Sequence, residues 1–521
     1  MATGLIILIF MLDALTPALA HARDAQPFVY AGWMAGVVAA AALVLTICRI
    51  RLERTGRIRH LLLAERTLSL SRSAVVGVHA YGMIELGWSL TAARLSNGLP
   101  VVRELVTALP PILAFVLIYF AYTPIQRRVR QSLLWRHLHQ GFPIAADRSL
   151  FQLLLEHIRH SILLALVPLL MLTVWRHAGD YVLSFHSWKS ASTLEWAKTI
   201  LQILGIFTIL ATSPWMLRFV WDTVPLQGGE LRRAVEDVFR RNQVSTREVL
   251  VWQTSSGTLN GALMGVLPRA RYVLFTDALL QILPTRQVEA VAAHEAGHGR
   301  LHHLPWLIGS TIAAAFAGGI LYSFGAAWII DPESWSGSAL AIAASGGAAL
   351  LTLGFVSRRF ELQADAFAAK DLSRFPAPLP SPSSAEPGEV VLPALPAPPS
   401  SVITEESVQA MIEALQTVAD LNGLPPRRFT WRHGTVVGRQ RHLQSIIGLP
   451  LDRLPIDRTV RILKATILGA AVLGAGLICV SILLPGSDDK VTHAPERAGK
   501  EARRFDPGRG SDPAPRSSHA R

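Results

Sequence analysis

Two histidines and a glutamate form the pattern His-Glu-x-x-His between residues 294 and 298. On an α-helix, side chains four residues apart project from the same face, so His294 and His298 can offer imidazole nitrogens to one metal ion. Glu295 follows the first histidine, where it can act as a base on a metal-bound water. The pattern is short, and by itself it is also compatible with two histidines satisfied inside an ordinary buried helix.

A carboxylate pair further along the chain can complete such a site. A catalytic zinc ion needs a third protein ligand. Glu361 and Asp365, in SRRFELQADAFAAK (357–370), lie four residues apart in a predicted helix, so both face the same way. One can bind the metal, and the other can hold a ligand histidine by its second ring nitrogen. Because apolar residues surround both carboxylates, we favour this interpretation over a solvated charged face.

The elements that must position these residues are largely apolar. Half of the 521 residues are hydrophobic, and several runs reach the roughly 20 residues that a bilayer-spanning helix needs. The sequence therefore predicts a mainly α-helical, polytopic membrane protein. The net charge of +13 comes from arginines beside apolar runs, so we expect a lipid bilayer and no nucleic acid as partner. The two cysteines lie in predicted spans, which excludes a disulfide framework and a cysteine-type zinc site.

Apolar and polar runs divide the chain into five segments. These are a signal-like or additional membrane segment (1–28), N-terminal transmembrane helices (29–218), a candidate catalytic domain (219–458), a last span (459–485) and a tail expected to be disordered (486–521). Residues 1–20 fit a cleaved signal or an uncleaved span, and both remain open. Spans are predicted around 29–48, 105–122, 155–175, 198–218, 307–330, 338–356 and 461–484, with a weaker one around 74–93.

Arginine-rich loops predict the orientation in the membrane. The loops at 49–72 and 123–150 are much richer in arginine than those at 94–104 and 176–196. By the positive-inside rule, the rich loops are cytoplasmic, which places 219–306 and its His-Glu-x-x-His pattern on the cytoplasmic side. Counting spans puts the tail outside, whereas its basic residues argue against that side.

The candidate catalytic domain contains a predicted membrane hairpin (307–356) and a Pro-rich loop (376–400) that could gate access to the site. Residues 404–423 are predicted to be a helix capped by Thr404. The segment RYVLFT (271–276) reads either as an edge strand that could pair with an extended substrate or as a buried core strand.

These motifs and their order resemble the M48 metallopeptidases over residues 225–450. HEAGH, a hairpin of spans and ELQAD follow one another as in that family, and LNGALMG (259–265) is similar to its Asn-Ala segment, with Gly261 in place of alanine. RHGTVVGRQRHL (432–443) is similar to its His-Pro segment, although Gly434 replaces the proline. His303, five residues after His298, is similar to the Ste24 branch of the family.

The resemblance implies a zincin-type (gluzincin) domain with a small β-sheet and one Zn²⁺ per chain. It implies that the zinc ligands are His294, His298 and Glu361, and that Glu295 is the general base. The remaining implied roles are oxyanion stabilisation by His433, support of the site by Asp365 and Arg439, and substrate positioning by Asn260.

The predicted function is a membrane-embedded zinc endopeptidase that cleaves membrane-associated proteins, in the inner membrane of a bacterium. Quality control and the processing of lipid-anchored tails both remain open as its role, as does the oligomeric state. The alternatives are a BlaR-type sensor-transducer, a catalytically inactive scaffold, and a transporter that uses the intramembrane residues His79 and Glu85. The transporter alternative leaves HEAGH and ELQAD unexplained.

Overall fold

The computed structural model describes residues 24–139, 149–187, 190–254, 258–325, 335–376 and 398–483. Most of the signal-like segment, nearly all of the Pro-rich loop and the whole predicted tail lie outside these ranges. Residues 1–471 form one compact unit and residues 472–521 a second, whose described part is the helical end of α16.

Helices dominate the N-terminal part of the chain, as the apolar runs predict. They are α2 (Pro27–Thr55), α3 (Ile58–Ile84), α4 (Trp88–Leu95), α5 (Pro100–His139), α6 (Leu150–His157), a π-helical turn (Ile158–Leu163), α7 (Leu164–Ser184) and α8 (Ala191–Val220). The weaker span predicted around 74–93 is wrong as a single helix, because α3 ends at Ile84 and the backbone turns left-handed at Gly87 before α4 begins.

Six stretches of helix in the described residues are long and apolar enough to cross a membrane. They are Pro27–Thr55, Pro100–Ser132, Leu150–Ser184, Thr193–Val220, His303–Ser323 and Leu340–Arg374. The fold class is therefore confirmed as a mainly α-helical, polytopic membrane protein. The helix α16 (Pro455–Leu483) occupies the last predicted span. It is not one of the six stretches found among the described residues.

A small mixed sheet lies in the candidate catalytic domain. Its strands are β1 (Thr223–Pro225), β2 (Glu248–Trp252), β3 (Gly261–Met264) and β4 (Tyr272–Thr276), in the order β1-β2-β4-β3. The strand β4 pairs with β2 in parallel and with β3 antiparallel, and all five of its residues are buried. The edge-strand interpretation of 271–276 is therefore wrong and the core-strand interpretation is right. The edge strand on this side of the sheet is β3.

Eight helices follow or flank the sheet in the described residues: α9 (Glu230–Arg241), α10 (Asp277–Ile282), α11 (Thr285–Arg300), α12 (His303–Gly325), α13 (Trp335–Arg374), α14 (Glu405–Leu421), α15 (Val436–Ser445) and α16. The central one is α11, which packs against α9, α13, α14 and β3. Small side chains at the contacts of α11 allow this close packing, since Ala290, Ala292, Ala293 and Ala296 are all fully buried.

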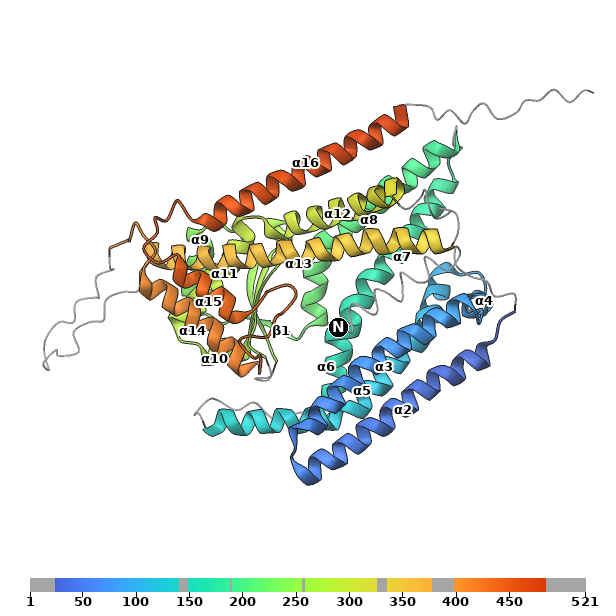
Figure 1. The fold of residues 1–521 in the computed structure, drawn as a ribbon, viewed down its shortest axis with the longest axis horizontal. Helices are drawn as coiled ribbons and strands as arrows, with labels where there is room; N and C mark the ends of the chain where they lie inside the picture. The colour runs from blue at the N-terminus through green and yellow to red at the C-terminus, as the bar shows by residue number, and fades with distance from the viewer. Residues whose placement is uncertain are drawn as a thin grey trace, which may run out of the picture. The chain divides into compact units, whose positions relative to one another are not determined.

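The second helix of the predicted hairpin continues without interruption into the next predicted helix. The sequence predicts a span that ends near residue 356 and a separate helix at 357–370, but both belong to α13, which runs beside α12 (Figure 1). The apolar membrane-spanning run and the carboxylates Glu361 and Asp365 therefore share one rigid element.

Candidate metal and catalytic site

The two histidines of α11 and one carboxylate of α13 converge on a common point. The Nε2 atoms of His294 and His298 lie 3.2 Å apart, and oxygens of Glu361 lie 3.7 Å from the first and 3.8 Å from the second. A tetrahedral zinc site with bonds of about 2.05 Å has ligand-to-ligand separations of about 3.3 Å. The two Glu361 distances are to different oxygens, and one ligand atom from each of the three residues lies within 4.8 Å of the others. The chemistry of these three donors fits a zinc ion.

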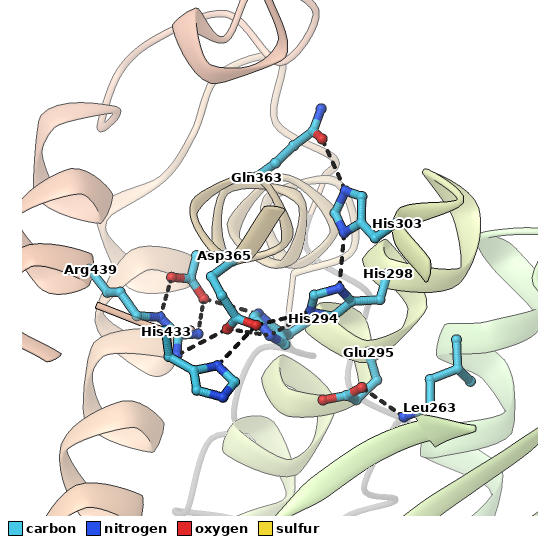
Figure 2. A network of polar contacts seen from close by, with 10 residues as sticks. Leu263, His294, Glu295, His298, His303, Gln363, Asp365, His433 and Arg439 are labelled. Carbon is cyan, nitrogen blue, oxygen red and sulfur yellow. Dashed lines mark hydrogen bonds and ion pairs between the residues drawn. The ribbon is translucent and has the colours of Figure 1, made fainter. Parts of the chain in front are cut away.

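The far nitrogen of His294 faces a buried ion pair. Asp365 Oδ1 lies 2.9 Å from His294 Nδ1, and the Asp365 side chain is fully buried. Arg439, from α15, donates to both oxygens of Asp365, at 2.7 and 2.6 Å (Figure 2). Its Nη1 also lies 3.3 Å from Glu361 Oε2. The guanidinium therefore compensates two buried carboxylates, and these in turn hold the His294 ring with its Nε2 toward the metal position.

The far nitrogen of His298 begins a chain of three hydrogen bonds. His298 Nδ1 lies 2.9 Å from His303 Nδ1, and His303 Nε2 lies 3.0 Å from Gln363 Oε1 (Figure 2). Gln363 Nε2 in turn donates to Asp457 Oδ1 at 2.7 Å. An amide oxygen only accepts, so His303 carries its proton on Nε2 and accepts on Nδ1. His298 must then donate from Nδ1, which leaves its Nε2 lone pair free for a metal ion.

Burial sets the charge states of the α11 side chains. Burial lowers the pKa of His298 to about 3, so its imidazole is neutral. Burial alone would also lower the pKa of His294, but Asp365 outweighs it and the net shift is upward. Burial raises the pKa of Glu295, whose Oε2 accepts a hydrogen bond of 2.8 Å from the backbone N–H of Leu263 in β3. A carboxylate with a raised pKa that is held in place is a stronger base than a free one and is suited to proton transfer.

His433 reaches the site from the loop between α14 and α15. Its Nδ1 lies 3.0 Å from Glu361 Oε1, while its side chain stays half-exposed. Gly434, which replaces the proline of the family motif, has φ of 76°, a value that proline cannot adopt. The N–H of Gly434 also donates to Thr430 O at 2.8 Å, a bond that proline cannot make. The chain thus places His433 by a turn that differs from a His-Pro turn.

A cavity of about 630 Å³ opens onto the three converging donors. Asn260, Gly261 and Leu263 line it from the edge of the sheet, and Met411, Leu415 and Val418 form an apolar wall on α14. The structure thus brings together all eight residues singled out in the sequence: His294, Glu295, His298, Glu361, Asp365, His433 and Arg439 around the donors, and Asn260 at the cavity wall. Sequence reasoning missed the partners Gln363 and Asp457 and the apolar wall of α14.

Comparisons with known proteins agree with the motifs. The model of peptidase family M48 matches residues 225–375. A protease HtpX homolog from Aeropyrum pernix is 28% identical over 221 residues, which cover 38% of this chain and 68% of that relative. The crystal structure of S. mikatae Ste24p is similar with a TM-score of 0.48 and 15% identity, and the match covers 81% of this chain and 100% of that one. The matched residues and the membrane-spanning helices together confirm the predicted resemblance: residues 225–375 match the peptidase family M48, and they belong to a chain with six helices that are long and apolar enough to cross a membrane.

Proposed function

We propose that the chain is a zinc-dependent endopeptidase that cleaves membrane-associated proteins. His294, His298 and Glu361 would hold one zinc ion, with Asp365 and Arg439 supporting the first of them. The observation that carries the proposal is the convergence of the Nε2 atoms of His294 and His298 with the Glu361 carboxylate, since one ligand atom from each residue lies within 4.8 Å of the others. When bound at such a site, zinc supplies a Lewis acid and a water of lowered pKa.

Glu295 is the proposed general base. It is partly buried and lines the cavity, its pKa is raised, and one of its oxygens accepts a hydrogen bond from the Leu263 N–H. The carboxylate would take a proton from the attacking water and return it to the leaving amine. His433, on the rim of the cavity, remains the candidate for stabilising the oxyanion. Because Nδ1 of His433 faces Glu361, its Nε2 would be the donor.

An extended substrate would pair with β3. The N–H of Leu263 points at Glu295 and not at β4, so this side of β3 faces the cavity. Peptide groups of alternate residues point the same way along a strand, and Gly261 therefore presents its N–H and C=O on that side. A substrate strand bonded there would run across the converging donors, with Asn260 beside it.

The proposed setting is a bacterial inner membrane, with the catalytic domain (219–458) on the cytoplasmic side. The arginine-rich loops support this orientation. The continuity of α13 supports membrane-associated substrates, because the metal-ligand helix is itself the end of a span. A gating role for residues 376–400 stays a prediction. It predicts that their deletion changes the cleavage of membrane substrates relative to short peptides.

The Glu295→Gln variant tests the proposal. We expect the purified variant in lipid nanodiscs to retain one zinc per chain by elemental analysis and to lose hydrolysis of a quenched-fluorescence peptide by at least 10³-fold. Retained hydrolysis would refute the role of Glu295. A further measurement uses the membrane proteins that the Glu295→Gln variant traps. If wild-type protein binds zinc but cleaves neither peptides nor these trapped proteins, the chain is a scaffold or a sensor.

A further inference from the structure

The loop between α14 and α15 carries a cluster of aromatic and basic side chains in contact with solvent. Phe429 and Trp431 are 61% and 40% exposed, and Arg427, Arg428 and Arg432 are exposed as well. Residues 424–434 contain no acidic residue, and none of the three arginines has an ion pair in the described part of the chain. We call residues 427–432 the aromatic–basic turn.

The aromatic–basic turn lies against α13 where that helix leaves its apolar run. The Trp431 ring covers the backbone of Gly354, since a Cβ at Gly354 would come within 2.5 Å of Trp431 Nε1. Arg358 Nη1 donates to Trp431 O at 2.7 Å, and the same guanidinium lies 5.4 Å from the Phe429 ring centroid. The turn thus occupies the level at which the apolar sequence ending at Val356 gives way to arginines.

Tryptophan gathers at the interface between hydrocarbon and water, and arginine beside it binds headgroup phosphates. We propose that the aromatic–basic turn docks on anionic lipid headgroups, with Trp431 and Phe429 in the interfacial layer and the three arginines among the phosphates. The partner is identified by charge, because the turn carries only cationic groups, and by continuity with the membrane-spanning helix on which it rests.

Lipid docking would also position His433, a consequence that rests on the proposed function. The hydrogen bonds Thr430 N–Gly434 O and Gly434 N–Thr430 O, at 2.9 and 2.8 Å, close a turn that holds both Trp431 and His433. Trp431 packs at Gly354 and His433 at Glu361, two helical turns or roughly 10 Å further along α13. Seating of Trp431 at the membrane surface therefore fixes the approach of His433 to the metal ligand.

The test measures where Trp431 lies, using the full chain in nanodiscs of phosphatidylcholine with or without phosphatidylglycerol. The fluorescence emission of Trp431 is obtained by subtracting the emission of the Trp431→Phe variant from that of wild type. The substitution removes one of 13 tryptophans. We expect at least a twofold loss of this difference emission with lipids brominated near the headgroup, and little quenching by aqueous iodide. Strong iodide quenching without bromolipid quenching would overturn the proposal.

The anionic preference has its own arm. We expect phosphatidylglycerol to increase bromolipid quenching in wild type and in Arg240→Gln, a matched change at an arginine that is 80% exposed on α9. The increase should be lost in Arg427→Gln/Arg428→Gln, and its retention there would overturn the assignment to anionic headgroups. The quenching measurement does not depend on catalysis and can be repeated in Glu295→Gln. A negative result would therefore overturn lipid docking without bearing on the proposed peptidase function.

Discussion

Replacing Gln363 by Leu should weaken metal binding without touching a metal ligand. Gln363 is buried and accepts from His303 Nε2 at 3.0 Å, and His303 accepts from His298 Nδ1. In Gln363→Leu, a metal-bound His298 still donates from its Nδ1 to His303 Nδ1, so His303 must carry its own proton on Nε2. That Nε2–H has lost its acceptor, because leucine replaces the Gln363 amide oxygen. Without metal, the two histidines can reverse their tautomers and avoid this state.

The cost therefore falls on the metal-bound form alone. A buried donor left unsatisfied costs about 1–3 kcal/mol, which corresponds to roughly 5- to 150-fold weaker binding at about 1.4 kcal/mol per tenfold. Competition with a chromogenic chelator measures the affinity, and hydrolysis at saturating zinc should change less than the affinity does. Asp457→Asn is the matched control, because an asparagine oxygen still accepts from Gln363 Nε2 and the affinity should stay within about twofold.

A folded Gln363→Leu protein that binds zinc within twofold of wild type would refute the reasoning. Equal loss in Asp457→Asn and Gln363→Leu would also contradict it, since the first preserves the acceptor and the second removes it.

Three further predictions concern the site. Arg439→Met leaves Asp365 and Glu361 buried without their cation, so it should lower the free energy of unfolding by about 3–5 kcal/mol. Thermal denaturation in nanodiscs measures this change. An unchanged midpoint temperature of unfolding would contradict the compensating role of Arg439. A proline at position 434 can neither adopt φ of 76° nor donate the hydrogen bond to Thr430 O. The kcat/KM of Gly434→Pro should therefore fall as far as that of His433→Ala, roughly 10²-fold if His433 stabilises the oxyanion. The kcat/KM of Gly434→Ala should lie between these values and that of wild type. Burial lowers the pKa of His298 to about 3, so its neutral form contributes stability above the unfolded pKa of about 6.5, and this stability is lost as pH falls toward 3. The free energy of unfolding of chelator-treated wild type should fall by about 1.5 kcal/mol between pH 6.5 and 5, and that of His298→Gln should fall by less.

The two pairs of candidate ligands could be predicted because they follow local periodicity, whereas the choice of Glu361 over Asp365 as ligand came from the family resemblance. His294 and His298, and likewise Glu361 and Asp365, lie four residues apart, and helical geometry alone places each pair on one face. The sequence also contained the signal that makes β4 an interior strand. YVLF (272–275) is a continuous apolar run, which is typical of a strand buried on both faces, whereas apolar and polar residues alternate in a half-exposed edge strand.

Other features depend on tertiary packing and left no local signal. The change from apolar to charged residues between Val356 and Arg358 suggests a boundary, but the backbone of α13 continues through it as one helix. Gln363 and Asp457 are 94 residues apart in the chain, and each looks like an ordinary polar position on a helix. Only the docking of the first turns of α16 beside α13 brings them together.

The central claim is that His294, His298 and Glu361 bind a catalytic zinc ion, and X-ray absorption at the zinc edge tests it most directly. Protein purified in nanodiscs should hold one zinc per chain, with scattering from two imidazoles near 2.0–2.1 Å and a carboxylate oxygen near 2.0–2.2 Å. His298→Gln should lose one imidazole contribution and most of the bound zinc. Zinc absent from active wild-type protein, or a coordination shell unchanged in His298→Gln, would contradict the account.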